Sequence, residues 1–150
     1  MSISANGVKA AASYGPWSIA HRDAVTRPIV DSFVNAVKAD GAAKKIVLVG
    51  TCFGGRHALL SGGAGSVVDA VVSFHPAGVT PSTELTALTV PTSIIVGDED
   101  DLMPVAQIDE AKAIFKEASE KNGSKGLEVN VLPKVSGAHL RSARVDSSHD

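Results

Sequence analysis

The chain has 150 residues, of which 44% are hydrophobic and 20% are charged, an ordinary balance for a soluble globular domain. The net charge of −2 gives no electrostatic reason to expect a nucleic acid or an anionic membrane as a partner. The single cysteine excludes an internal disulfide and a cysteine-based structural zinc site. The apolar runs are far too short to span a membrane, and we find no secretory signal, so we expect a cytoplasmic enzyme or binding domain.

The first part of the chain, residues 1–22, shows no sustained period and is interrupted by Gly15-Pro16, so we expect irregular or disordered chain there. Residues 23–150 carry the periodic patterns of one folded domain. Thr26 suits a helix N-cap and Pro28 a first turn, and the apolar residues that follow recur at helical spacing. This pattern predicts a helix over about residues 27–39, ended by Gly41.

Four short apolar runs predict β-strands, at residues 45–49, 69–74, 93–97 and 127–132. Helices are predicted between them, one over residues 56–60 and one that Pro104 opens and Asn122-Gly123 closes. The inward residues predicted for the second of these are Val105, Ile108, Ala111, Ile114, Phe115 and Ala118. Alternating strands and helices indicate an α/β fold with a parallel sheet, and strands that are apolar on both faces predict helices on both sides of it.

The stretch Gly50-Thr51-Cys52-Phe53-Gly54-Gly55 follows the first predicted strand and precedes a helix. This order is typical of a nucleophile elbow, with a cysteine in place of the usual serine. The strained turn requires small residues two positions away on each side, and the helix N-terminus would stabilise a thiolate and offer N–H groups to an oxyanion. The alternative is a buried structural cysteine in a glycine-rich turn.

Chemically useful side chains follow three of the predicted strands. Cys52 follows the first, an acidic cluster at residues 98–101 follows the third, and His139 follows the fourth. The carboxyl ends of parallel strands meet at one rim of a sheet, where such folds place their working sites. The order nucleophile, acid, histidine is that of the α/β-hydrolases. The other histidines, His21, His57 and His149, have no partner at metal-ligand spacing and are expected at the surface, so no metal site is predicted.

With these residues assembled, the chain resembles the dienelactone hydrolase family, particularly its fungal members, over roughly residues 24–146. The matching pieces are Thr26-Arg27-Pro28-Ile29-Val30-Asp31, Gly50 to Arg56, Val72-Ser73-Phe74-His75-Pro76, Gly97-Asp98-Glu99-Asp100 with Pro104, and Gly137-Ala138-His139. The resemblance implies Cys52 as the nucleophile, Asp100 as the acid and His139 as the base, with the N–H of Phe53 as an oxyanion donor. Asp100 is preferred to Asp98 and Asp101 because it stands three after the glycine and four before the proline, as in the family pattern.

The resemblance also suggests residues that bind the substrate. Arg144 resembles an arginine that follows the histidine in fungal members and could hold a carboxylate, with Arg141 as the alternative. His75 could line the pocket or only end its strand. Two departures stand out: the strands that precede the first helix in the family are not found, and Leu140-Arg141 follows His139 where Gly-Phe is usual. We therefore expect a partial α/β-hydrolase fold of about four parallel strands, without the N-terminal strands and the C-terminal helix.

The function implied is hydrolysis of activated esters or enol lactones by a Cys-His-Asp triad, through a thioester acyl-enzyme and without a metal or organic cofactor. The partner expected is a small ester or lactone. A thioesterase of the same fold is one alternative, and an inactive binding or redox-sensitive protein is another. Because no strand is found before residues 46–49, one edge of that strand lacks a neighbour. We expect the chain to form a homodimer through this sheet edge, to pair with a missing fragment, or to be only marginally stable.

Overall fold

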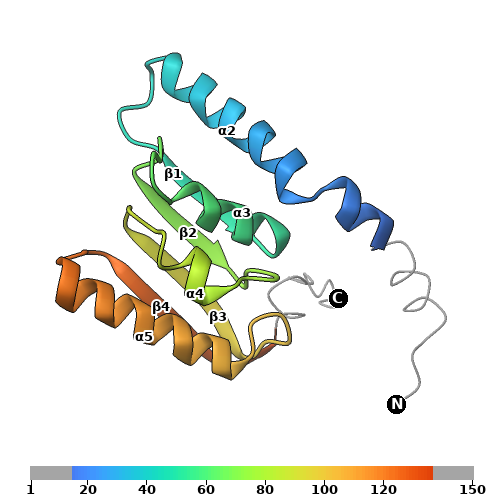
Figure 1. Ribbon diagram of the computed structural model, residues 1–150, viewed down its shortest axis with the longest axis vertical. Coiled ribbons are helices and arrows are strands. Elements are labelled where there is room, and N and C mark those ends of the chain that lie inside the picture. Colours follow the sequence, from blue (N-terminus) through green and yellow to red (C-terminus); the bar gives the residue numbers. More distant parts are fainter. Residues whose placement is uncertain (1–14, 137–150) are drawn as a thin grey trace, which may run out of the picture.

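The computed structural model describes residues 15–136 (Figure 1). Along the chain the elements are α2 (Asp23–Ala39), β1 (Val47–Thr51), α3 (Phe53–Ser61), β2 (Ala70–Phe74), α4 (Pro81–Glu84), β3 (Thr92–Glu99), α5 (Val105–Asn122) and β4 (Leu127–Ser136). Residues 15–20 form a further short helix, where irregular chain was predicted. The predicted site residues His139, Arg141 and Arg144 lie outside the described part of the chain, as do residues 1–14.

The four strands form one parallel sheet in the order β1-β2-β3-β4. The register pairs Val49 with Val72 and Ile94 with Val129, so the carboxyl ends of the strands share one rim. Each predicted strand is therefore confirmed, with ends that move by a few residues. β1 and β4 are the edge strands of the described sheet.

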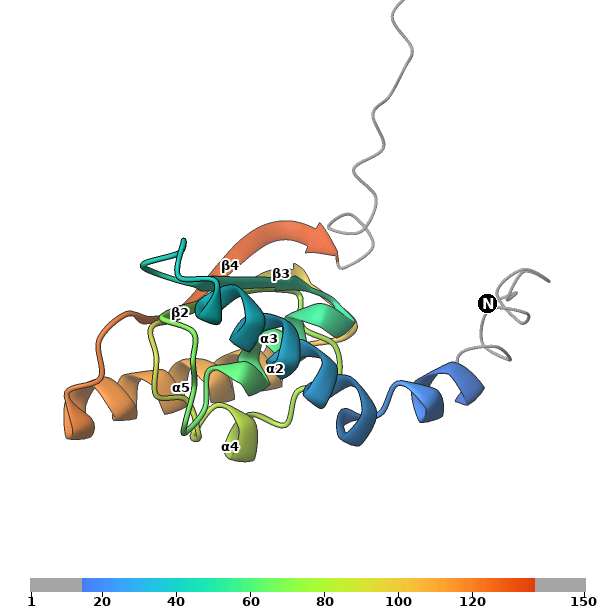
Figure 2. The ribbon, with the colours of Figure 1, turned by 90° about the horizontal axis from the view of Figure 1, so that it is seen from above.

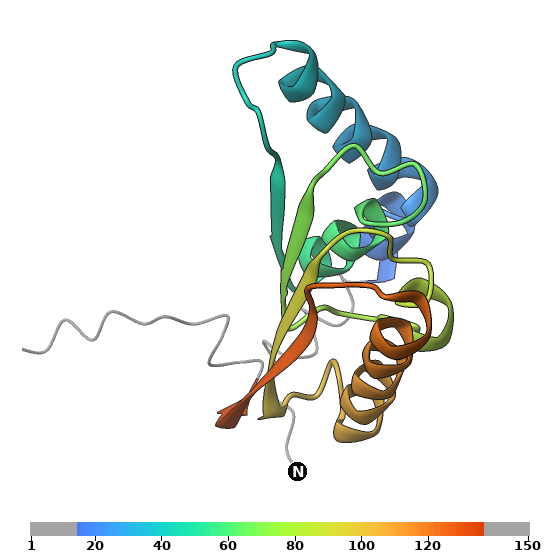
Figure 3. The ribbon, with the colours of Figure 1, turned by 90° about the vertical axis from the view of Figure 1, so that its left-hand side faces the viewer.

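The described helices lie on one face of the sheet, which corrects the prediction of helices on both faces (Figures 2 and 3). The register places Val47, Val49 and Thr51 of β1 on the opposite face, beside Phe74 of β2 and Ile95 of β3. On that open face Val47 and Val49 remain 53% and 59% exposed. Apolar residues on both sides of a strand thus indicate a face that can be covered, but they do not show that it is covered in this chain.

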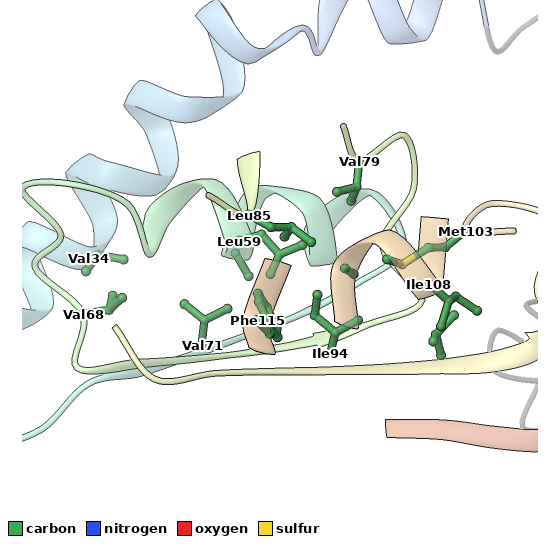
Figure 4. Close-up of a cluster of buried hydrophobic side chains, with 13 residues drawn as sticks. Val34, Leu59, Val68, Val71, Val79, Leu85, Ile94, Met103, Ile108 and Phe115 are labelled. Carbon is green, nitrogen blue, oxygen red and sulfur yellow. The ribbon is translucent and has the colours of Figure 1, made fainter. Parts of the chain in front are cut away.

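The core lies between the sheet and the helices (Figure 4). Ile94 of β3 and Leu59 of α3 are fully buried. From α5, Ile108, Ala111 and Phe115 are buried as predicted, whereas Val105 is 55% exposed because it occupies the first position of the helix, outside the inward stripe. Within residues 15–136, no helix is both long and apolar enough to cross a membrane.

The first long helix begins earlier than predicted. α2 starts at Asp23, with Arg22 in an extended conformation before it, so Thr26 lies inside the helix and is not its N-cap. The Thr26 hydroxyl donates instead to the carbonyl of His21, at 2.9 Å. Asp23 suits the first turn because a carboxylate there faces the positive end of the helix dipole. Pro28 was predicted in the first turn, but it is the sixth residue of α2 and lies inside the helix, where it cannot donate a backbone hydrogen bond.

Candidate active site

Cys52 occupies the sharp turn between β1 and α3. Its φ of 55° and ψ of −119° lie outside the regions that a residue with a side chain ordinarily adopts. Three backbone hydrogen bonds hold the turn: the N–H of Cys52 donates to the carbonyl of Phe74, and the carbonyl of Cys52 accepts from the N–H groups of Arg56 and Ala77, at 3.0 to 3.2 Å. Strain that is fixed by its surroundings is typical of functional sites and is what a nucleophile elbow requires.

Two glycines allow the strand and the helix to approach each other at this turn. A Cβ atom on Gly50 would lie 2.1 Å from the carbonyl oxygen of Gly54, and one on Gly55 would lie 2.8 Å from Ser73 Oγ. A Cβ on Gly54 would meet nothing within 4 Å. The close packing predicted two residues before Cys52 is therefore confirmed at Gly50. The close packing predicted two residues after it, at Gly54, is wrong, because on the helix side Gly55 is the crowded position.

The thiol of Cys52 is free and partly exposed at the rim of the sheet. Phe53, the first residue of α3, contributes one of the first four amide groups of that helix, which have no acceptor within the helix. Such an amide can donate to an anion that forms beside the sulfur. The elbow therefore places a partly exposed thiol next to an amide that has no acceptor within the helix.

His75 directly follows β2 beside the elbow, and its side chain lies in the interior, while the pocket-lining role considered for it stays a prediction. Its side chain is 0% exposed, and its Nε2 lies 3.2 Å from Thr51 Oγ1. Its backbone N–H donates to the carbonyl of Ile95, and its φ of 33° is positive. His75 thus connects the ends of β1, β2 and β3 beneath the rim and does not face outward.

The acidic cluster after β3 divides sharply by burial. Asp100 is 4% exposed, whereas Asp98, Glu99 and Asp101 are exposed. One carboxylate oxygen of Asp100, Oδ1, accepts from the N–H of Leu102 at 2.8 Å. The other, Oδ2, is buried and has no hydrogen-bond partner within residues 15–136. Since a buried acceptor without a donor is costly, this oxygen points to a donor in another part of the protein.

Arg56, the fourth residue of α3, joins three helices. Its guanidinium donates to both carboxylate oxygens of Asp23, at 2.6 and 2.9 Å, and to Glu84 Oε1, at 2.6 and 3.1 Å. The hydrogen bond from Arg56 lowers the pKa of the Asp23 carboxyl below its usual value. Arg56 thus forms ion pairs that tie α2 and α4 to the elbow helix.

Four aromatic rings lie beside the elbow, and the sequence did not reveal them. Trp17 stacks on His21 and meets the edge of Phe53, and Phe53 in turn contacts His57, with ring centroids 4.4 to 4.9 Å apart in these pairs. His57 was expected at the surface but is 2% exposed. The spacing of Phe53 and His57, four residues apart on one helix face, was the signal that could have indicated this.

A groove of about 220 Å³ runs along the open side of β1, between α2 and α3. Its lining is mainly apolar, and His57 lies in its wall with neither ring nitrogen hydrogen-bonded within the described chain. The lining residues are Thr26, Val30, Leu48, Val49, Gly50, Phe53, Gly54, His57 and Ala58. Across residues 15–136, no three His, Cys, Asp or Glu side chains gather in a way that could hold a metal ion.

The sequence of this chain matches a known protein family. The sequence profile of the dienelactone hydrolase family matches residues 5–144, so the chain belongs to that family. Among curated proteins, none matches the chain.

Solved structures show the same α/β-hydrolase fold. A protein assigned to the dienelactone hydrolases from Klebsiella pneumoniae superposes with a TM-score of 0.64 at 18% identity, covering 76% of this chain and 50% of its own. An α/β serine hydrolase homologue from Coxiella burnetii gives a TM-score of 0.56 at 22% identity, covering 75% and 50%. The chain therefore spans about half the length of these structures.

Proposed function

We propose that this chain hydrolyses activated esters or enol lactones with a triad of Cys52, His139 and Asp100. The observation that carries the proposal is the buried Oδ2 of Asp100, which has no donor within residues 15–136, at the rim where Cys52 occupies a strained elbow. In a triad the acid accepts a hydrogen bond from the histidine, holds its tautomer and stabilises the imidazolium. An imidazole N–H is the donor that this oxygen lacks.

The position of His139 along the chain supports its role as the base. β4 ends at Ser136, which pairs with Glu99, the residue before Asp100. His139 follows three residues later, and three residues span at most about 10 Å. The described chain therefore ends beside the acidic cluster, and within that cluster the burial of Asp100 and its unpaired Oδ2 favour it over the exposed Asp98 and Asp101.

The proposed reaction has two steps. His139 takes the proton from the Cys52 thiol, and the thiolate attacks the carbonyl carbon while the N–H of Phe53 donates to the oxyanion. The tetrahedral adduct collapses with cleavage of the ester C–O bond, His139 returns the proton to the leaving oxygen, and a thioester remains on Cys52. Water, deprotonated by His139, then attacks the thioester, and the carboxylic acid and the thiol are released.

Thiol chemistry limits the substrate that this reaction can use. A thiol has a pKa of about 8.5, whereas a hydroxyl group such as that of water has one of about 15.7, so a thiolate leaves more readily than an alkoxide. The tetrahedral adduct formed on a plain alkyl ester therefore tends to expel the thiolate again. An enol or aryl oxygen is a better leaving group and lets the reaction proceed. Arg144, or Arg141 in its place, is proposed to bind a carboxylate of the substrate. Together these features favour a small enol lactone or aryl ester as the substrate.

A chromogenic aryl ester tests the proposal directly. We expect Cys52→Ala to abolish hydrolysis, and Asp100→Asn and His139→Ala to lower kcat on the order of 10³- to 10⁴-fold, as loss of a triad partner does. Glu99→Gln, which removes a neighbouring exposed carboxylate, serves as the matched control and should change kcat less than about twofold.

Iodoacetamide separates the proposed enzyme from its alternatives. We expect it to alkylate native Cys52 at neutral pH, and His139→Ala to slow the reaction. Full turnover by Cys52→Ala would rule out the nucleophile. A reactive thiol in a chain with no esterase activity would instead favour the redox-sensitive protein, and a preference for thioesters over aryl esters would favour the thioesterase.

A further inference from the structure

A short segment at the end of β2, residues 74–77, holds the turn at Cys52. The carbonyl of Phe74 accepts from the Cys52 N–H at 3.0 Å, and the N–H of Ala77 donates to the Cys52 carbonyl at 3.1 Å. His75 lies between these two contacts and directly follows β2. Both backbone polar groups of Cys52 are thus bonded to this one segment, which we call the elbow clamp.

The elbow clamp is itself fixed in the interior. The side chain of His75 is 0% exposed, and its backbone N–H donates to the carbonyl of Ile95 in β3, at 2.8 Å. Pro76 is also fully buried, and a Cβ atom on Gly55 would lie 3.3 Å from its Cα. The clamp therefore cannot move without disturbing either the end of β3 or the first turn of α3.

The imidazole of His75 also reaches the last residue of β1. Its Nε2 shares a hydrogen bond of 3.2 Å with the hydroxyl of Thr51, the residue before Cys52. Thr51 is exposed, whereas His75 is buried, so this bond ties the outer end of β1 to the interior. The turn is thus held at Thr51 through a side chain and at Cys52 through the backbone.

These contacts act on a backbone that is strained at two positions. Cys52 has a φ of 55° and a ψ of −119°, and His75 has a φ of 33°. A residue with a side chain keeps such angles only where its surroundings hold it. The strain at one residue and the net contribution of one hydrogen bond are of similar size, so the loss of a single contact can let part of the population relax.

We infer that His75 is a positioning residue for Cys52: through the Thr51 hydroxyl and the elbow clamp, it holds the sulfur in place for attack. This inference rests on the proposed function, in which Cys52 is the nucleophile. It also gives a buried histidine beside the rim a role that requires no contact with the substrate.

The test removes the hydroxyl that His75 binds. Thr51→Val keeps a β-branched side chain of the same shape, and Thr51→Ser keeps the hydroxyl. The readouts are the rate of Cys52 alkylation by iodoacetamide at neutral pH, and kcat and KM on the chromogenic aryl ester. We expect Thr51→Val to lower the alkylation rate and kcat about 3- to 10-fold, as loss of one hydrogen bond does, and to change KM less than about twofold. Thr51→Ser should recover most of both rates.

A second substitution tests whether the effect passes through His75. His75→Phe keeps a buried ring but loses the bond to Thr51, so adding Thr51→Val to it should slow alkylation no further. Thr86→Val, which removes an exposed hydroxyl bonded only to nearby carbonyls, is the matched control and should behave as the wild type. Wild-type alkylation and kcat in Thr51→Val would overturn the positioning role, and so would additive effects in the double variant. If His75→Phe does not fold, the two Thr51 variants still decide the question.

Two further results separate positioning from other failures. We expect Thr51→Val to unfold cooperatively with a Tm within about 5 °C of the wild type, and loss of that transition would replace positioning with a purely structural role. A wild type that does not hydrolyse the ester would overturn the proposed function instead. The alkylation rates of the wild type and Thr51→Val would then still show whether His75 positions the sulfur.

Discussion

His57 shows how a single side chain can couple this fold to pH. Its imidazole is 2% exposed, it contacts the ring of Phe53, and its nearest acidic atom is Asp23 Oδ1, 4.0 Å from Nε2. Burial lowers the pKa of His57 below its ordinary value of 6.5, and the Asp23 charge opposes this only in part. The folded state therefore favours the neutral ring.

We predict that acid destabilises the protein through His57. As the pH falls below about 6.5, the unfolded chain binds a proton at this position before the folded chain does, so the free energy of unfolding decreases until the lowered pKa of the folded state is passed. Above about pH 7 the effect is absent. Urea unfolding from about pH 5 to pH 8 should show this slope in the wild type and a weaker one in His57→Phe. His21→Gln, at an exposed position, is the control and should keep the wild-type slope.

Single residues also show how far the sequence could predict the site. The turn at Cys52 could be recognised from a glycine-rich stretch between a strand and a helix, although only Gly50 of the two glycines expected to be crowded is required by packing. Asp100 could be chosen among four acids only through spacing that resembles a family, because burial of one carboxylate in a charged cluster leaves no pattern in the sequence. The burial of His57 and His75 was missed for the same reason: a histidine can be as well accommodated in a core as at a surface.

At the scale of elements, the junction of β1 and α3 gives the sharpest prediction. Alanine at Gly50 would place a Cβ atom 2.1 Å from the backbone oxygen of Gly54, which cannot move without shifting the helix, whereas Gly54 has open space around its Cα. We predict that Gly50→Ala lowers the free energy of unfolding by about 1–3 kcal/mol. Gly54→Ala, the matched change four residues on, should raise it by about 0.5–1 kcal/mol because alanine favours a helix.

Urea unfolding of both variants at one pH decides this prediction. Equal effects of the two substitutions would show that the turn can relax and that Gly50 is not required by packing. The chromogenic assay adds a second readout, because a shifted α3 also moves the Phe53 amide away from the sulfur.

The four strands and the end of α5 could be predicted from the sequence, whereas the start of α2 and the uncovered face of the sheet could not. Four apolar runs separated by turn residues gave all four strands, and Gly123, with a φ of 64°, ends α5 where the sequence placed its end. The start of α2 was missed because Thr26 and Pro28 resemble a cap and a first turn, although the helix already begins at Asp23. Helices on both faces were wrongly expected because a strand's composition reports its ability to be buried and not the presence of a cover.

At the scale of the whole molecule, the outer edge of β1 is open within the described chain. Residues 46 and 52 make backbone hydrogen bonds to the β2 side, so alternation turns the backbone groups of Val47, Val49 and Thr51 outward. β1 contains no charge and no proline, the usual protections of an edge strand. α2 lies on this side of the molecule (Figure 1), and its Ile29 and Phe33 are 66% and 68% exposed.

We predict that the chain self-associates through this edge, as the proposed homodimer. Sedimentation at tens of micromolar protein should show a species larger than the monomer, and Val49→Pro should reduce it, because proline removes an outward N–H and leaves the pairing with β2 intact. Val49→Ala keeps the N–H and is the control for the apolar surface alone. A stable monomer at these concentrations would contradict the prediction.

The open face of the sheet also changes how the molecule should respond to heat and denaturant. Val47 and Val49 are already in contact with water before unfolding begins, so their hydration changes little when the chain opens. The heat capacity of unfolding and the denaturant m-value both scale with newly wetted surface. For a chain of this length both quantities should therefore be small, and the stability curve correspondingly broad and flat.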